Sequence, residues 1–149
     1  MTGLPEPQVG LVISYAYLWF AEARRGQVEG SKDRPCAIIL RIESPGSEDT
    51  QRKRVAVVPI THSPPHNPSA AIEIPPRVKQ HLGLDSERSC VVLDEINVFT
   101  WPGCDLRPIR DGGGRVDYGF LPPRFFDQLV AKFAQLATAG SVSRASRDE

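Results

Sequence analysis

The stretch Lys32-Asp33-Arg34-Pro35-Cys36-Ala37-Ile38-Ile39-Leu40 leads from a charged corner straight into an apolar run. Proline holds the residue before it in an extended conformation and cannot donate to a central ladder, so Arg34 and Pro35 mark the beginning of a strand. A second apolar run, Val55-Ala56-Val57-Val58-Pro59-Ile60-Thr61, follows a polar connection over residues 43–53 that contains glycine and proline. Two such runs joined by a turn-forming loop predict an antiparallel pair of strands.

The connection between the two runs also predicts how they pair. If residue 42 lies opposite residue 54, Arg34 falls opposite Thr61 or His62, with the opposed β-carbons about 5 Å apart. This register would bring a guanidinium group and a hydroxyl group together at one end of the sheet.

Length and charge limit the class of protein. The 149 residues suffice for one domain with one core. Lysine plus arginine and aspartate plus glutamate number 18 each, so a polyanionic partner must be bound by a local patch, and a general DNA-coating protein is disfavoured. The three cysteines, Cys36, Cys90 and Cys104, show no Cys-x-x-Cys spacing. They predict reduced thiols in a cytosolic protein.

The amino-terminal part carries no targeting signal that we recognise. Residues 1–9 contain two prolines and little that can pack, which predicts a flexible arm. The apolar run over 11–20 is too short and too polar to span a bilayer. Its β-branched and aromatic residues predict a buried strand over 10–19, followed by a polar loop over 21–33. We expect a cytoplasmic protein with no membrane partner.

The middle of the chain alternates short elements with turns. Residues 62–69 contain three prolines and predict a surface loop over the end of the sheet that carries Arg34. Further strands are expected over 71–74, 89–96 and 115–121, and one short internal helix over 75–83.

The clearest helix covers residues 122–137. It begins at a proline, is closed by Gly140, and has apolar side chains at three- and four-residue steps, namely Phe126, Leu129, Val130, Phe133, Leu136 and Ala137. The serine-rich, charged tail over 141–149 is expected to be disordered. The sequence therefore predicts a mainly β fold over 10–140, a small, partly closed antiparallel barrel with a carboxy-terminal helix.

The order of these features resembles the MazF/PemK-type toxins of bacterial toxin–antitoxin modules over residues 10–136. The features that carry the resemblance are Gly10 before the first strand, Glu29 five residues before Arg34-Pro35, the strand 36–40, the run 57–61, and Leu84-Asp85 with the strand 89–96. The resemblance implies an SH3-like barrel that dimerises and cleaves single-stranded RNA without a metal, by attack of a ribose 2′-hydroxyl on the adjacent phosphate.

Such a reaction builds charge on phosphorus, and Arg34 matches the position of the group that would stabilise it. A guanidinium is permanently charged and gives two parallel hydrogen bonds. Thr61 can donate to a phosphate oxygen. The alternatives are an ordinary ion pair of Arg34 with Asp33 or Glu29, and a strand-end threonine that bonds only local backbone.

Proton transfer has two candidates. His62 titrates near neutrality and is adjacent to Thr61, whereas Glu29 matches the acidic position of the family. His66 is four residues from His62, but the intervening Pro64-Pro65 prevents the helix on which that spacing makes a metal pair. We therefore expect no metal and no cofactor.

Four further residues are candidates for RNA binding. Arg24, Arg25 and Lys32 precede Arg34 and would line a groove with it. Trp101 can stack on an unpaired base, although aromatic residues of small barrels are often core residues.

Two partners are also expected. The aromatic first strand and the phenylalanines of the last helix suggest more apolar surface than one barrel buries, which predicts a homodimer. The resemblance implies a cognate antitoxin, and an acidic unfolded segment of it would compete for the same groove.

The sequence thus supports two functions. The first is a toxin-type endoribonuclease, an mRNA interferase that inhibits growth as part of a type II toxin–antitoxin module. The second is a non-catalytic barrel that binds a protein or nucleic-acid partner, gyrase poisoning included. The neutral net charge and Gln27-Val28, where the family usually has Gly-Ser, favour the second.

Overall fold

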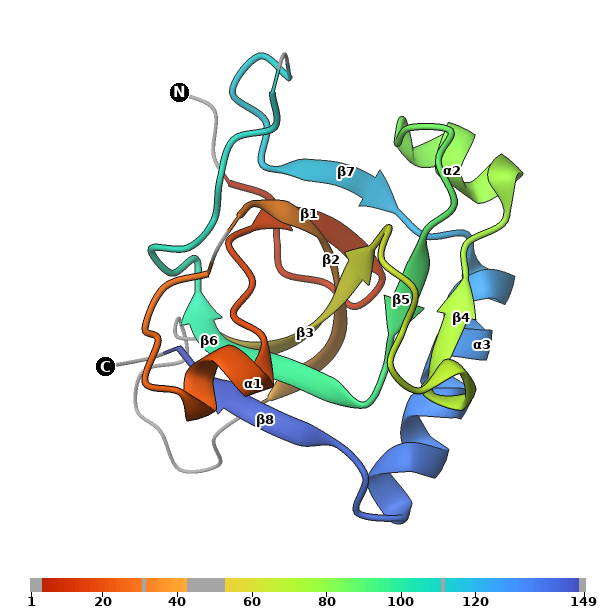
Figure 1. Ribbon diagram of the computed structural model, residues 1–149. Helices are drawn as coiled ribbons and strands as arrows, with labels where there is room; N and C mark the ends of the chain where they lie inside the picture. Colours follow the sequence, from red (N-terminus) through yellow and green to blue (C-terminus); the bar gives the residue numbers. More distant parts are fainter. Residues whose placement is uncertain (1–3, 31, 43–52, 111, 148–149) are drawn as a thin grey trace.

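The computed structural model describes residues 4–30, 32–42, 53–110 and 112–147 (Figure 1). In these residues the chain forms eight strands and three α-helices, so the predicted mainly β class with a carboxy-terminal helix is confirmed. The elements in chain order are β1 (Leu11–Tyr15), α1 (Phe20–Arg24), β2 (Arg34–Ile42), β3 (Lys53–Thr61), the 3-10 turn η1 (Pro68–Ala70), β4 (Ala71–Glu73), α2 (Pro76–Leu82), β5 (Cys90–Val92), β6 (Glu95–Trp101), β7 (Asp117–Phe120), α3 (Pro123–Thr138) and β8 (Ser143–Ser146).

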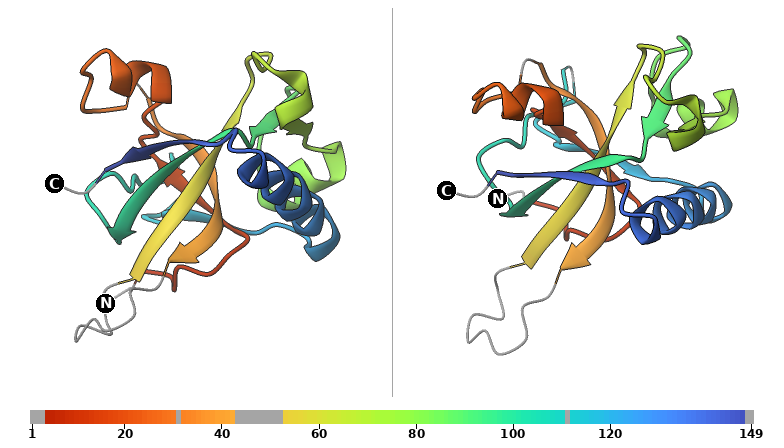
Figure 2. Two further views of the ribbon diagram at one scale, coloured as in Figure 1. Left: turned by 90° about the horizontal axis from the view of Figure 1, so that it is seen from below. Right: turned by 60° about the horizontal axis from the view of Figure 1, so that its bottom comes forward.

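Strand β3 is the centre of the sheet. It pairs with β2 along one edge and with both β5 and β6 along the other, giving the order β4-β5-β3-β2-β1-β7 with β6 and β8 branching from β3. All pairs are antiparallel except β6 with β8. The sheet curls, with α3 along one side of it and α1 at its opposite end (Figures 1 and 2).

The predicted register of β2 and β3 is confirmed at the hairpin end. Ile42 faces Arg54, and a bulge between Ile38 and Leu40 then shifts the pairing so that Cys36 faces Pro59. Carried two residues further, this register sets Arg34 opposite Thr61. The bulge thus decides between the two partners that the sequence allowed. The predicted connection over 43–53 falls almost entirely outside the described residues.

The expected strand over 89–96 is divided into β5 and β6. Val91 faces Ile60 and Asn97 faces Val57, so five residues on one side stand opposite two on the other. Pro59, which has no N–H to donate, lies at this break. These residues are not paired with β3: Asp94 lies between the two strands, and Glu95 begins β6 and pairs with Ser143 of β8.

The predicted strand over 10–19 is longer than β1, and the first part of the predicted loop over 21–33 belongs to a helix. β1 ends at Tyr15, where the chain leaves the sheet and Ala16 N donates to the carbonyl of Asp105 instead of to a neighbouring strand. Residues 20–24, expected in a loop, form α1, whose Glu22 carboxylate accepts from Trp19 N at 3.1 Å and so satisfies a free donor at the helix start.

Helix α3 packs on the sheet over a face that overlaps the predicted one, because Leu129 and Phe133 are buried and Phe126 and Leu136 pack against the core. The buried stripe runs through Phe125, Leu129 and Phe133, which are four residues apart. Val130 and Ala137, expected on the packed face, are exposed because they lie off that stripe. No helix in the described part of the chain is long and apolar enough to cross a membrane.

The flexible arm over 1–9 and the disordered tail over 141–149 stay predictions, and several described residues there contact the rest of the chain. Strand β8 pairs in parallel with β6, from Glu95 opposite Ser143 to Val98 opposite Ser146. Arg147 then binds Asp105 at 3.0 Å, with only 4% of the arginine side chain exposed. At the other end Pro7 is buried. An open strand edge and a buried acid hold the tail, and neither is visible in its polar composition. Residues 1–3 and 148–149 lie outside the described part.

Arg147→Met is expected to lower the free energy of unfolding by about 3–5 kcal/mol, because it leaves Asp105 buried without its partner. Urea unfolding followed by circular dichroism measures the change. Arg144→Met is the matched control, since Arg144 is exposed on the same strand, and it should cost less than about 0.5 kcal/mol. Equal small losses would contradict a docked tail.

Candidate functional site

Arg34, the first residue of β2, presents a positive charge that has no counter-ion. Its guanidinium carbon lies 5.0 Å from the ring centroid of Trp19. Its Nε is buried without a hydrogen-bond partner, and no carboxylate of the described residues pairs with it. Asp33 instead faces Arg107 at 3.7 Å. Because a buried cation is normally paired, Arg34 is suited to bind an external anion.

Thr61 ends β3 with its hydroxyl still free to donate. The side chain is 7% exposed, and its Oγ1 accepts a hydrogen bond from the backbone N–H of Ser63 at 3.1 Å. A hydroxyl has one donor and two acceptor positions. The local backbone bond expected as an alternative role is therefore present, and it uses only an acceptor position.

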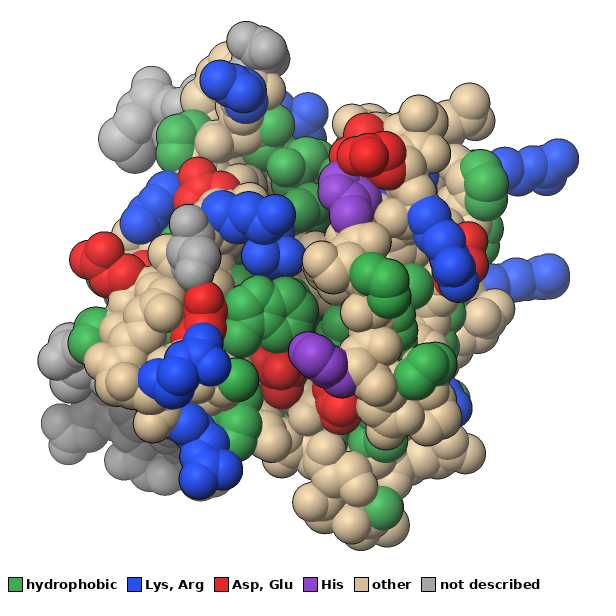
Figure 3. Space-filling view, in the orientation of Figure 1, with side chains coloured by type: hydrophobic (Ala, Val, Ile, Leu, Met, Phe, Trp, Pro, Cys, Tyr) green, Lys and Arg blue, Asp and Glu red, His purple; other side chains and the backbone are tan. Residues whose placement is uncertain are grey.

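Arg34 and Thr61 line both of two neighbouring pockets. The large pocket, of about 460 Å³, lies between α1 and the proline loop that follows β3. The small pocket, of about 130 Å³, lies toward Asp85. The large pocket is lined by Trp19, Ala21, Glu22, Arg25, Arg34, Thr61, Ser63, Pro64, Pro65, His66, Asn67, Val92, Asp94 and Glu95. Figure 3 shows hydrophobic, cationic and anionic side chains meeting in the hollowed centre of this face.

Glu95 forms part of the large pocket and is held by one of its two oxygens. Oε1 accepts from the Tyr17 hydroxyl at 3.1 Å and from Phe20 N at 2.9 Å. No hydrogen bond or ion pair from any described residue reaches Oε2. Burial raises the pKa of Glu95 above its ordinary value, against the two donors, which lower it. The neighbouring Asp94 also has a pKa raised by burial.

Asn97 positions the wall that carries Trp19. Its side chain is fully buried, Oδ1 accepts from Leu18 N at 2.9 Å, and Nδ2 donates to Leu18 O at 2.8 Å. Arg147 Nη1 adds a bond to the same Oδ1 at 3.2 Å. These bonds satisfy the backbone of a segment that has left the sheet, and so set the direction in which Trp19 and α1 follow.

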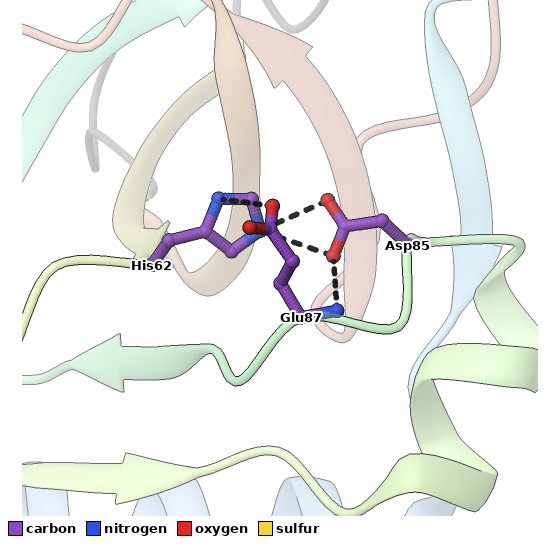
Figure 4. Close-up of side chains that lie close together, drawn as sticks. All are labelled: His62, Asp85 and Glu87. Carbon is purple, nitrogen blue, oxygen red and sulfur yellow. Dashed lines mark hydrogen bonds and ion pairs between the residues drawn. The ribbon is translucent and has the colours of Figure 1, made fainter.

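His62 and Asp85 line the small pocket, and Glu87 lies beside them (Figure 4). His62 Nε2 lies 2.9 Å from Asp85 Oδ2, and Nδ1 lies 3.6 Å from Glu87 Oε2. Because a carboxylate can only accept hydrogen bonds, Nε2 is the donor toward Asp85, and Nδ1 also faces a carboxylate.

Lys79 of α2 holds the Asp85 carboxylate and the neighbouring backbone in place. Its side chain is 5% exposed, and its Nζ donates to Asp85 Oδ1 at 2.8 Å, to Ser89 Oγ at 2.7 Å and to the carbonyl of Glu87. The hydrogen bond from Lys79, and then that from His62, lower the pKa of Asp85. His62, Asp85 and Glu87 have the spacing of metal ligands, but the ammonium group already occupies Asp85, which disfavours a cation there.

The structure brings some of the predicted residues together and separates others. Arg25 lines the large pocket, and Lys32 and His62 line the small one. Arg24 and Glu29 are exposed and line neither.

Trp101 lies at the far end of the sheet. It faces Lys53, at the opposite end of β3 from Thr61, and packs 6.2 Å from Phe99. A strand of this length spans roughly 25 Å, so Trp101 is well outside both pockets.

Sequence reasoning missed Trp19, Asp94 and Glu95 as pocket residues, and Lys79 as a buried anchor. Two signals were present in the sequence. Pro59 inside a central apolar strand predicts an interruption of the ladder near Asp94 and Glu95, and the single amide in the apolar run 96–99 marks Asn97, which was also missed.

Tyr17→Phe is expected to raise the pKa of Glu95 further, because the phenol O–H stabilises the ionised carboxylate. A pH titration of the side-chain carboxyl carbon of Glu95 by NMR measures it. Tyr118→Phe is the control, since the Tyr118 hydroxyl bonds Ser14 and not Glu95. A pKa that stays constant or falls in Tyr17→Phe would show that the bond does not exist in solution.

Comparison with protein-family models and with curated protein sequences found no match to this chain. The resemblance to MazF/PemK-type toxins thus rests on the order of features along the sequence, and it stays a prediction.

Proposed function

We propose that this protein is a toxin-type endoribonuclease that cleaves single-stranded RNA by 2′-hydroxyl transesterification, in the SH3-like barrel fold of the MazF/PemK family. One observation carries the proposal. The guanidinium of Arg34 is partly buried, has no counter-ion among the described residues, and lies at the strand end that it shares with the Thr61 hydroxyl. This is the donor set that a phosphodiester in the act of displacement requires.

The proposed reaction takes place at a phosphate bound by Arg34 and Thr61. The 2′-oxygen forms a bond to phosphorus and the bond from phosphorus to the 5′-oxygen breaks, leaving a 2′,3′-cyclic phosphate and a 5′-hydroxyl. Arg34 and Thr61 donate to the phosphate oxygens, whose charge grows in the transition state. The 2′-hydroxyl loses one proton to a base and the leaving 5′-oxygen gains one, so the step is balanced and involves no change of oxidation state.

His62 is the stronger candidate for proton transfer. His62 would take the proton of the 2′-hydroxyl, and Asp85 and Glu87, at 2.9 Å and 3.6 Å from its two ring nitrogens, would stabilise the imidazolium that forms. Glu29 is exposed and lines neither pocket, so it is left in an outer role near the charged corner.

The dimer and the antitoxin remain part of the proposal through the resemblance alone. The aromatic residues expected to supply surplus apolar surface are packed inside the chain: Tyr15 and Tyr17 are 0% and 1% exposed, and Phe125 and Phe133 are buried in α3. The exposed large apolar side chains of the described residues are Leu4, Val9, Val28, Leu40, Phe120 and Val130.

Arg34→Ala is expected to lower the rate of RNA cleavage by about a hundredfold or more, because a transition-state donor is lost. Arg34→Lys should restore only part of it, since an ammonium lacks the fork of parallel donors. The measurement is cleavage of a long single-stranded RNA in the presence of a chelator, with the new ends mapped. Arg77→Ala, an exposed change on α2, is the control and should cleave like the unchanged chain.

Two results would count against the proposal. Intact RNA in every sequence context would favour the non-catalytic binding barrel. Equal cleavage by the unchanged chain and Arg34→Ala would place the reaction elsewhere.

A further inference from the structure

Part of the large pocket has a chemistry that a phosphate site does not need. Arg25 and Arg34 contribute positive charge, whereas Glu22, Asp94 and Glu95 contribute three carboxylates. An ionised carboxylate only accepts hydrogen bonds and repels phosphate. The group that occupies this part of the pocket must therefore present hydrogen-bond donors.

Glu95 is preorganised to receive such donors. Its Oε1 is fixed by Tyr17 and by the backbone of Phe20, which leaves Oε2 as the oxygen without a partner. Donors that favour the ionised form would also offset the burial that raises the pKa of Glu95 and of Asp94. A carboxylate held in this way is selective, because it cannot turn to suit a different ligand.

Trp19 adds a flat aromatic surface to the same pocket. Its ring is fixed by an edge contact with Tyr17 at 5.3 Å between centroids and by Arg34 at 5.0 Å. Indole rings stack on unpaired bases, and a volume of about 460 Å³ is in the range of pockets that bury small ligands.

We propose that the large pocket binds an unpaired guanine base adjacent to the phosphate held by Arg34, with its N1–H and 2-amino group both donating to Oε2 of Glu95, the oxygen that no described residue binds, and its ring against Trp19. Guanine alone among the four RNA bases presents two neighbouring donors on its pairing edge. Adenine and cytosine place an acceptor nitrogen beside the amino group, and uracil has a single N–H between two carbonyls. This inference rests on the proposed function for the phosphate and adds the base.

The test uses single-stranded tetranucleotides that lack 2′-hydroxyl groups, so that binding is measured without cleavage. Four carry guanine, adenine, cytosine or thymine at one central position. A fifth carries hypoxanthine, which keeps N1–H and lacks the 2-amino group. NMR follows the indole N–H of Trp19, while that of Trp101, at the other end of β3, serves as an internal control.

The guanine tetranucleotide is expected to bind about tenfold or more tightly than the other four, hypoxanthine included, and to shift the Trp19 signal but not that of Trp101. Glu95→Gln should reduce the preference to about threefold or less, because the amide whose oxygen faces Tyr17 and Phe20 places an NH2 donor where Oε2 accepts. The variant keeps an oxygen to accept from Tyr17 and Phe20, so its fold should persist. Glu73→Gln, on β4, is the matched control and should keep the preference.

Three outcomes overturn the inference: equal binding of all bases by the unchanged chain, a guanine preference that survives Glu95→Gln, or no binding at all. The RNA cleavage assay on the same samples separates the two proposals. Cleavage without base preference leaves the ribonuclease standing and removes the guanine pocket. Guanine preference without cleavage supports the pocket and removes the ribonuclease.

Discussion

The candidate site depends on a pair of hydrogen bonds between a side-chain amide and a piece of backbone that has left the sheet. Asn97 is fully buried, and its amide binds both the N–H and the C=O of Leu18. A backbone segment that loses its ladder partners must find others or lose its folded position. Asn97 supplies both at once, so Trp19 and α1 continue from a fixed point, and the large pocket acquires its wall.

The same residue depends in turn on the interruption of the ladder beside β3. Five residues between Val91 and Asn97 stand opposite only two between Val57 and Ile60. The surplus moves Glu95 to where it accepts from Tyr17 and Phe20. One local irregularity therefore sets the position of Glu95, while the pairing of β2 with β3, shifted by its bulge, sets Arg34 opposite Thr61.

The sequence could predict what the hairpin determines. Arg34 and Thr61 belong to two neighbouring strands, and a local register was enough to bring them together. Glu95 and Trp19 are 76 residues apart in the numbering and meet only through the packing of β6 against the segment after β1, for which no short-range pattern exists. The contacts of the carboxy-terminal residues could not be predicted for a related reason. Their polar composition predicts disorder, whereas the strand β6 and the buried Asp105 that they contact lie elsewhere in the chain.

Two arginines show why environment, and not residue type, assigns a role here. Arg147 is nearly inaccessible and fully engaged, by Asp105, by Asn97 and by the carbonyl of Ala16, so its charge is neutralised and its contribution is structural. Among the described residues Arg34 has the face of Trp19 and no carboxylate, and a ring face stabilises a cation by about 0.5–2 kcal/mol, which does not replace a counter-ion. A guanidinium in this position is suited to an anion from outside, because the part of the chain that the structure describes offers it no counter-charge.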